Sequence, residues 1–133
     1  MQPRSSDFTY TDTSFARDPS VEGYFNCPIL LPDGAVVTAF TGVIYDANGS
    51  DYTRCDLKRE SMDIIPPSEL MASTGTTGLA FNLGYVALTD DTVDYATIDN
   101  AAYWYFAECR IGATSQGVYG IVVEYTVSGL PVI

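Results

Sequence analysis

The chain has 133 residues, of which 47% are hydrophobic and 13% aromatic, and this size and composition indicate one globular domain rather than a disordered chain. Its 17 acidic and 6 basic residues give a formal net charge of −11. Because binding to a polyanion needs Lys and Arg to displace counterions, nucleic acid and anionic membrane surfaces are excluded as partners. No apolar run is long enough to insert into a membrane, and the opening MQPRSSDFTY lacks the apolar core of a signal peptide.

Turn-forming residues divide the chain at short intervals, which is typical of an antiparallel sandwich or barrel. The LPDG turn at 31–34 and the Asn48-Gly49 turn separate the first expected strands. The strands expected from alternation and turn spacing cover residues 22–30, 35–45, 51–59, 69–74, 79–88, 92–98, 102–111 and 117–127. Pro66–Ala72 is the one helix candidate, and it is a single turn at most.

The alternation is clearest over 102–111, where both faces of the strand are apolar. One face carries Tyr103, Tyr105, Ala107, Cys109 and Ile111, and the other carries Trp104, Phe106, Glu108 and Arg110. We predict an all-β fold, an antiparallel two-sheet sandwich of jelly-roll type with about eight or nine strands. An immunoglobulin-like sandwich is the alternative, although the order of cysteines and tryptophan does not favour it, since Trp104 follows two of the three cysteines.

The chain is expected to form a single β-sandwich domain over residues 1–133. Within it we distinguish an N-terminal arm at 1–15, the sandwich at 16–127 and a C-terminal tail at 128–133. Phe8 and Tyr10 in the arm are expected to contact another copy or a different partner. The same is expected of Leu130, Val132 and Ile133 in the tail. The alternative is that both ends lie on their own sheets as ordinary edge strands.

The residues needed for catalysis are missing. With no His, the usual Ser–His and Cys–His pairs cannot form, and Lys58 is the only lysine available for a Ser–Lys dyad. Glu108 and Glu124 are expected on outward faces of the sheets, where acids are ordinary. We therefore predict that the protein is not an enzyme.

The three cysteines, Cys27, Cys55 and Cys109, contain no CxxC pair and do not suggest zinc. Cys55 and Cys109 fall on the apolar faces of expected strands, so we predict buried free thiols. Calcium is the one cofactor candidate, because oxygen ligands gather at a turn and again around Asp90. The calcium ligands proposed at the turn are Asp46, Asn48, Ser50 and Asp51. Asp and Asn also form turns for backbone reasons alone, so this reading stays open.

Trp104 and Phe106 admit three interpretations: core residues, a subunit interface, or a platform for sugar rings. Several stretches also resemble small secreted bacterial β-sandwich domains of undefined function. These stretches are LPDGA at 31–35, Tyr45-Asp46, CDLKR at 55–59, DNAAYWY at 99–105 and GIVVEY at 120–125. At the level of fold, size and composition, the chain is also similar to jelly-roll proteins that decorate virus capsids.

Our first functional hypothesis is a non-enzymatic structural subunit of an extracellular or virion-surface assembly, of the capsid-decoration or surface-filament type. It would self-associate as a homo-oligomer through sheet faces and terminal arms. The second hypothesis is a carbohydrate-binding or adhesion module of a secreted protein, and an enzyme is a distant third.

Overall fold

The chain folds into strands that alternate between two sheets. The structure, a computed structural model, describes residues 5–12, 23–46, 53–63, 68–75, 85–111 and 116–128. Its strands are β1 (Ser5–Asp12), β2 (Gly23–Ile29), β3 (Val36–Asp46), β4 (Thr53–Ser61), β5 (Glu69–Gly75), β6 (Tyr85–Asp90), β7 (Tyr103–Ile111) and β8 (Gln116–Ser128). The described part of the chain contains no helix. The predicted all-β architecture is confirmed.

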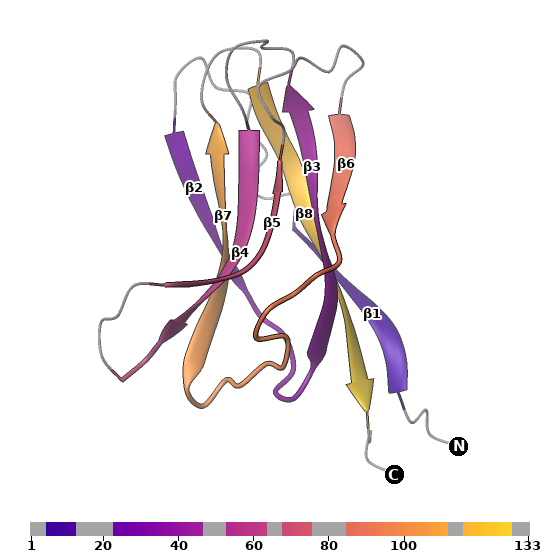
Figure 1. Cartoon of the computed structure of the whole chain (residues 1–133), viewed down its shortest axis with the longest axis vertical. Helices are drawn as coiled ribbons and strands as arrows, with labels where there is room; N and C mark the ends of the chain where they lie inside the picture. The colour runs from indigo at the N-terminus through magenta and orange to yellow at the C-terminus, as the bar shows by residue number, and fades with distance from the viewer. Residues whose placement is uncertain are drawn as a thin grey trace.

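Two four-stranded antiparallel sheets face each other, one in the order β1-β8-β3-β6 and the other in the order β2-β7-β4-β5 (Figure 1). The pairing is nested along the sequence. The first strand pairs with the eighth, the second with the seventh, the third with the sixth and the fourth with the fifth. The chain is therefore one long hairpin wound around a core, which is the jelly-roll topology that the sequence predicts.

Two local predictions are wrong. Residues 92–98 do not form a strand, because Tyr95 has a left-handed backbone (φ 52°) that interrupts the extended conformation. The backbone N–H groups of Asp94 and Ile98 bond instead to the carbonyls of Met71 and Ala35. Pro66–Ala72 is not a helical turn over its described part, because Glu69–Ala72 lie in β5. Ser5–Asp12 of the expected arm form β1, the edge strand beside β8, which is the alternative arrangement given above for the N-terminal end.

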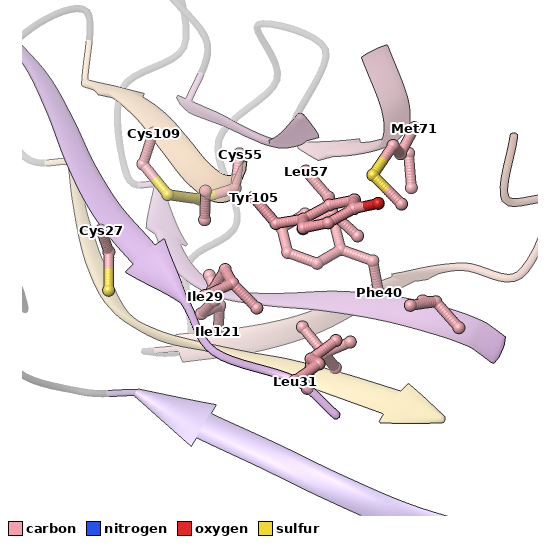
Figure 2. Packing of buried hydrophobic residues seen from close by; sticks show 14 of the residues in the cluster. Cys27, Ile29, Leu31, Phe40, Cys55, Leu57, Met71, Tyr105, Cys109 and Ile121 are labelled. Carbon is pink, nitrogen blue, oxygen red and sulfur yellow. A yellow bond between two sulfur atoms is a disulfide. The ribbon is translucent and has the colours of Figure 1, made fainter. Parts of the chain in front are cut away.

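The core lies between the two sheets and is built from alternating residues of both (Figure 2). Phe40, Ile44, Ile121 and Val123 point inward from the first sheet. Leu57, Tyr105, Ala107 and Ile111 point inward from the second, together with other members of the cluster. The Tyr-bearing face of β7 is therefore the buried one, and Trp104, Phe106, Glu108 and Arg110 face outward.

A disulfide links Cys55 of β4 to Cys109 of β7 (Figure 2). The two residues are direct partners in the β4–β7 register, and their Cα atoms lie 4.0 Å apart. The prediction of two separate thiols is thus wrong, although both side chains are buried as expected. Alternation along one strand reveals the face of a residue but not its cross-strand partner. Cys27 is the free cysteine, and it is buried.

Removing the disulfide is expected to destabilise the fold, because the bridge restricts the unfolded chain over a sequence separation of 54 residues. We expect the Cys55→Ala/Cys109→Ala double variant to lose about 3 kcal/mol of unfolding free energy in urea titrations. The matched control is the single variant Cys27→Ala, which should retain the Cys55–Cys109 bridge. Alkylation of the unreduced, unfolded wild-type protein should modify Cys27 alone, and modification of all three cysteines would contradict the bridge.

Side-chain hydrogen bonds join the two sheets at the β5–β6 edge. The Asp90 carboxylate on β6 accepts a hydrogen bond from the Ser73 backbone N–H on β5 at 3.0 Å. It also accepts bonds from the Thr92 N–H (2.9 Å) and hydroxyl (2.7 Å). The Thr74 hydroxyl donates to the Leu88 carbonyl at 2.7 Å. The Ser73 and Thr92 bonds lower the pKa of Asp90 below its ordinary value, because they favour the charged carboxylate.

Asp90→Asn is expected to lower the unfolding free energy by about 1 kcal/mol at pH 7, because it weakens a charged acceptor that joins the sheets. A depressed pKa in the folded state contributes stability that is present above about pH 4 and is lost as the pH falls through the folded value. The cost of the substitution should therefore shrink in urea titrations repeated at about pH 3. Asp91→Asn at the exposed neighbouring position is the control, and it should leave the unfolding free energy unchanged at both pH values.

Candidate functional site

The outer face of the β2-β7-β4-β5 sheet gathers most of the chemistry that the described residues offer. Outward residues of β7 align with those of β2 on one side and of β4 on the other. The resulting cross-strand rows are Tyr24–Arg110–Arg54, Asn26–Glu108–Asp56 and Pro28–Phe106–Lys58, with Glu60 opposite Trp104 in a fourth. One end of the face is therefore charged, and the other end is apolar.

The apolar end, which we call the apolar patch, consists of Pro28, Leu30, Met62, Trp104 and Phe106. Leu30 is 81% exposed, Met62 56% and Trp104 53%. The patch surrounds a shallow hollow of about 270 Å³ beside Trp104. The Trp104 and Phe106 ring centroids lie 6.2 Å apart with the planes tilted by 47°. The core interpretation of Trp104 is thus wrong, and the interface and sugar-platform interpretations stay open.

A second hollow, of about 240 Å³, lies on the Phe106 side of Trp104. It is lined by Asn26, Pro28, Glu60 and the two aromatic rings. Here an amide and a carboxylate stand beside exposed ring surface. Among the described residues, the second hollow thus has a carboxylate in its lining and no aliphatic side chain except Pro28, whereas Ile29, Leu30 and Met62 line the first.

The charged end, which we call the charged hollow, has a volume of about 220 Å³. It is lined by Tyr24, Arg54, Asp56, Lys58, Glu108 and Arg110. The Arg54 Nε donates to an Asp56 carboxylate oxygen at 2.7 Å, and the Lys58 Nζ donates to Glu108 at 2.9 Å. The Ser73 hydroxyl donates to the same Asp56 oxygen at 2.7 Å. Each of these two acids thus has a basic partner.

The charge of this face differs from that of the chain as a whole. Arg54, Lys58 and Arg110 balance Asp56, Glu60 and Glu108, so the rows described above sum to zero. The whole chain carries −11. The excess acid therefore lies outside these rows.

The other predicted site residues are not among the described residues of this face. Phe8 and Tyr10 lie in β1, the edge strand of the opposite sheet, and their contact with a second copy stays a prediction. Leu130, Val132 and Ile133 lie outside the described residues. So do Asn48, Ser50 and Asp51 of the calcium proposal, while Asp46 ends β3. Among the residues that the structure describes, no group of three or more acids or cysteines could hold a metal ion.

Sequence reasoning missed several members of this face, above all Leu30, Met62 and Tyr24. A signal for Leu30 existed, because Leu31 is a core residue and two successive residues of an extended chain point to opposite sides. No comparable signal identifies Met62. It reaches the patch because its backbone N–H bonds to the Ala102 carbonyl at 3.0 Å, close to the start of β7.

Sequence reasoning also missed a stack that closes one end of the sandwich. The Arg59 guanidinium lies 3.9 Å from the ring centroids of both Tyr95 and Tyr103. Its Nε donates to Glu69 at 2.9 Å. Cation–π contact with two rings, together with an ion pair, gives this arginine a structural role.

No protein-family model and no curated protein matches this chain. Within the described ranges, the structure contains no helix of the length and apolar character needed to cross a membrane.

Trp104 is the only tryptophan in the chain, so intrinsic fluorescence reports on the apolar patch directly. With 53% of its surface exposed, its emission in dilute solution should resemble that of free tryptophan and be quenched efficiently by acrylamide. Unfolding in urea should shift the emission maximum only slightly. Emission that is strongly blue-shifted and protected from acrylamide at every concentration would contradict the outward placement of Trp104.

Proposed function

We propose that this protein is a non-enzymatic structural subunit of an extracellular or virion-surface assembly, and that copies associate through the apolar patch. The observation that carries the proposal is the clustering of Leu30, Met62 and Trp104, three large and well-exposed side chains, around one hollow. Isolated exposed apolar residues are common on proteins, whereas a contiguous cluster is typical of an interaction surface.

Charge favours a second copy of this chain as the occupant. Two copies that each carry −11 repel one another over most of their surfaces. The outer face of the β2-β7-β4-β5 sheet has balanced charges along its rows, so copies meeting there avoid most of this repulsion. The aliphatic side chains of Pro28, Leu30 and Met62 also match another apolar surface better than a polar ligand.

The Cys55–Cys109 disulfide supports a location outside the cytoplasm. Disulfides persist in oxidising compartments and are rare where glutathione and thioredoxin keep thiols reduced. A non-catalytic role is supported by the lack of histidine and by the engagement of Asp56 and Glu108 in ion pairs.

Carbohydrate binding is the second candidate function, and the hollow between Trp104 and Phe106 is the observation that favours it. Aromatic ring faces there adjoin the Asn26 amide and the Glu60 carboxylate. Such groups can hydrogen-bond sugar hydroxyls while the rings cover the C–H face of the sugar. The hollow beside Leu30 has more aliphatic lining, from Ile29, Leu30 and Met62, which is why self-association is the first proposal.

Leu30→Glu is expected to abolish association, because it places a charge in the centre of the interface. In sedimentation-velocity runs over a concentration series, the wild-type protein should gain mass with concentration and the variant should stay monomeric. Burying Leu30, Met62 and Trp104 contributes roughly 4–6 kcal/mol before ordering costs, so we expect at least a tenfold weakening.

The matched control is Ala87→Glu, which adds the same charge to an exposed position on the outer face of the other sheet. It should associate like the wild type. A wild-type protein that remains monomeric at millimolar concentration, or equal weakening by both variants, would overturn the proposed self-association.

A further inference from the structure

Two aromatic rings line the hollow of about 240 Å³ on the Phe106 side of Trp104. The two ring centroids lie 6.2 Å apart and the planes are tilted by 47°, so the rings are not stacked face to face. Trp104 is 53% exposed, which leaves ring surface open to a ligand. Because the face of an aromatic ring is electron-rich, it attracts cations, and tryptophan does so most strongly. The hollow therefore offers ring surface to a positively charged group.

A carboxylate stands beside these rings. Glu60 of β4 is the direct partner of Trp104 in the β4–β7 register, and it lines the same hollow. The side chains of directly opposed residues on neighbouring strands lie close together. Glu60 is half-buried, and it forms no hydrogen bond or ion pair with another residue that the structure describes. A negative charge and aromatic ring surface thus meet at one place.

The bases that neighbour Glu60 along β4 are bonded to other acids. Lys58, two residues earlier on the same face of the strand, donates to Glu108 at 2.9 Å. Arg59 donates to Glu69 at 2.9 Å and lies against two tyrosine rings. The carboxylate of Glu60 is therefore available to a cation from solution.

We propose that this hollow binds an organic cation of the quaternary ammonium class, with the ammonium group beside the Trp104 ring and the Glu60 carboxylate. The chain carries −11, and this charge draws cations towards it and repels anions. A primary ammonium brings three hydrogen-bond donors, for which the described lining offers the Glu60 carboxylate and the Asn26 amide oxygen. A quaternary ammonium has no such need, and its methyl groups suit the rings and Pro28.

The test follows the fluorescence of Trp104, the only tryptophan, while the full chain at micromolar concentration is titrated with choline at constant ionic strength. The comparison ligand is the neutral carbon analogue of choline, in which a tert-butyl group replaces the trimethylammonium group. The analogue keeps the shape and removes the charge. We expect choline to bind at least about tenfold more tightly, because attraction to the rings and to Glu60 both require the charge.

Three variants separate a local site from a general charge effect. Glu60→Gln should weaken choline binding by about tenfold and leave binding of the neutral analogue unchanged. Glu124→Gln makes the same change in net charge at an exposed position of the other sheet and should alter neither affinity. Phe106→Leu removes one ring and should weaken choline binding several-fold while the circular dichroism spectrum stays unchanged.

A quaternary ammonium group can reach the hollow as a free solute or as the headgroup of phosphatidylcholine. Sedimentation of the protein with phosphatidylcholine vesicles, lost in Glu60→Gln, would identify the headgroup as the source. Choline binding without vesicle sedimentation would identify a free cation. Either result supports the ammonium site.

Equal affinity for choline and its neutral analogue, no saturable change of emission at tens of millimolar choline, or equal effects of Glu60→Gln and Glu124→Gln would each overturn the proposal. Saturable binding of a neutral sugar without binding of choline would identify carbohydrate as the ligand of the hollow, and would also overturn it.

The site goes beyond the self-association proposed above, which uses the Leu30 and Met62 side of Trp104. Leu30→Glu keeps every described residue of this hollow and is expected to bind choline at least as tightly as the wild type does, because the added acid attracts cations. A failure of choline binding is therefore distinguishable from a failure of self-association.

Discussion

The register between β4 and β7 is the constraint on which both the core and the outer face depend. It sets Cys55 opposite Cys109, Leu57 opposite Ala107 and Arg54 opposite Arg110. A slip of one residue would reverse every side chain of a strand, which would bury Trp104 and expose Tyr105. The disulfide fixes this register covalently at one of its pairs. The same alignment that closes the core therefore also assembles the charged hollow and the apolar patch on the other side of the sheet.

The chain is strongly acidic, yet the charges along the outer face of the β2-β7-β4-β5 sheet balance. On a protein with as many basic as acidic residues, a sheet face of zero net charge would be ordinary. On a chain of −11, basic residues are scarce, and three of them line a single hollow. Two of them have acidic partners on the same face, since Arg54 donates to Asp56 and Lys58 donates to Glu108. Outside the charged hollow, the acidic surface favours solubility and discourages contact between copies.

The sequence predicted the fold class well because alternation and turn chemistry are local. The alternation along β7 and the LPDG turn follow from neighbouring residues alone, and Gly34 has the positive φ of 81° that such a turn uses. Which face of β7 is buried did not follow, because both faces are apolar. The disulfide and the site required knowledge of strand order. Cys55 and Cys109 become partners, and Arg54 meets Arg110, only because β4 lies beside β7. The failed strand at 92–98 has a different cause, since the left-handed Tyr95 lies against Arg59, a contact between distant segments.

The pairing of the first strand with the last has a mechanical consequence. Ser5 lies opposite Ser128, so the start of β1 and the end of β8 lie together at one end of their sheet (Figure 1). Tension applied through these two points would break the β1–β8 hydrogen bonds one pair after another instead of loading all pairs at once. Sequential rupture of this kind needs little force. The bridge between Cys55 and Cys109 would stop the extension at these two residues, because the segment between them cannot be pulled straight while the bridge is intact. A domain of this design begins to unfold at low force when its two ends are pulled, and it can lengthen only as far as the disulfide allows.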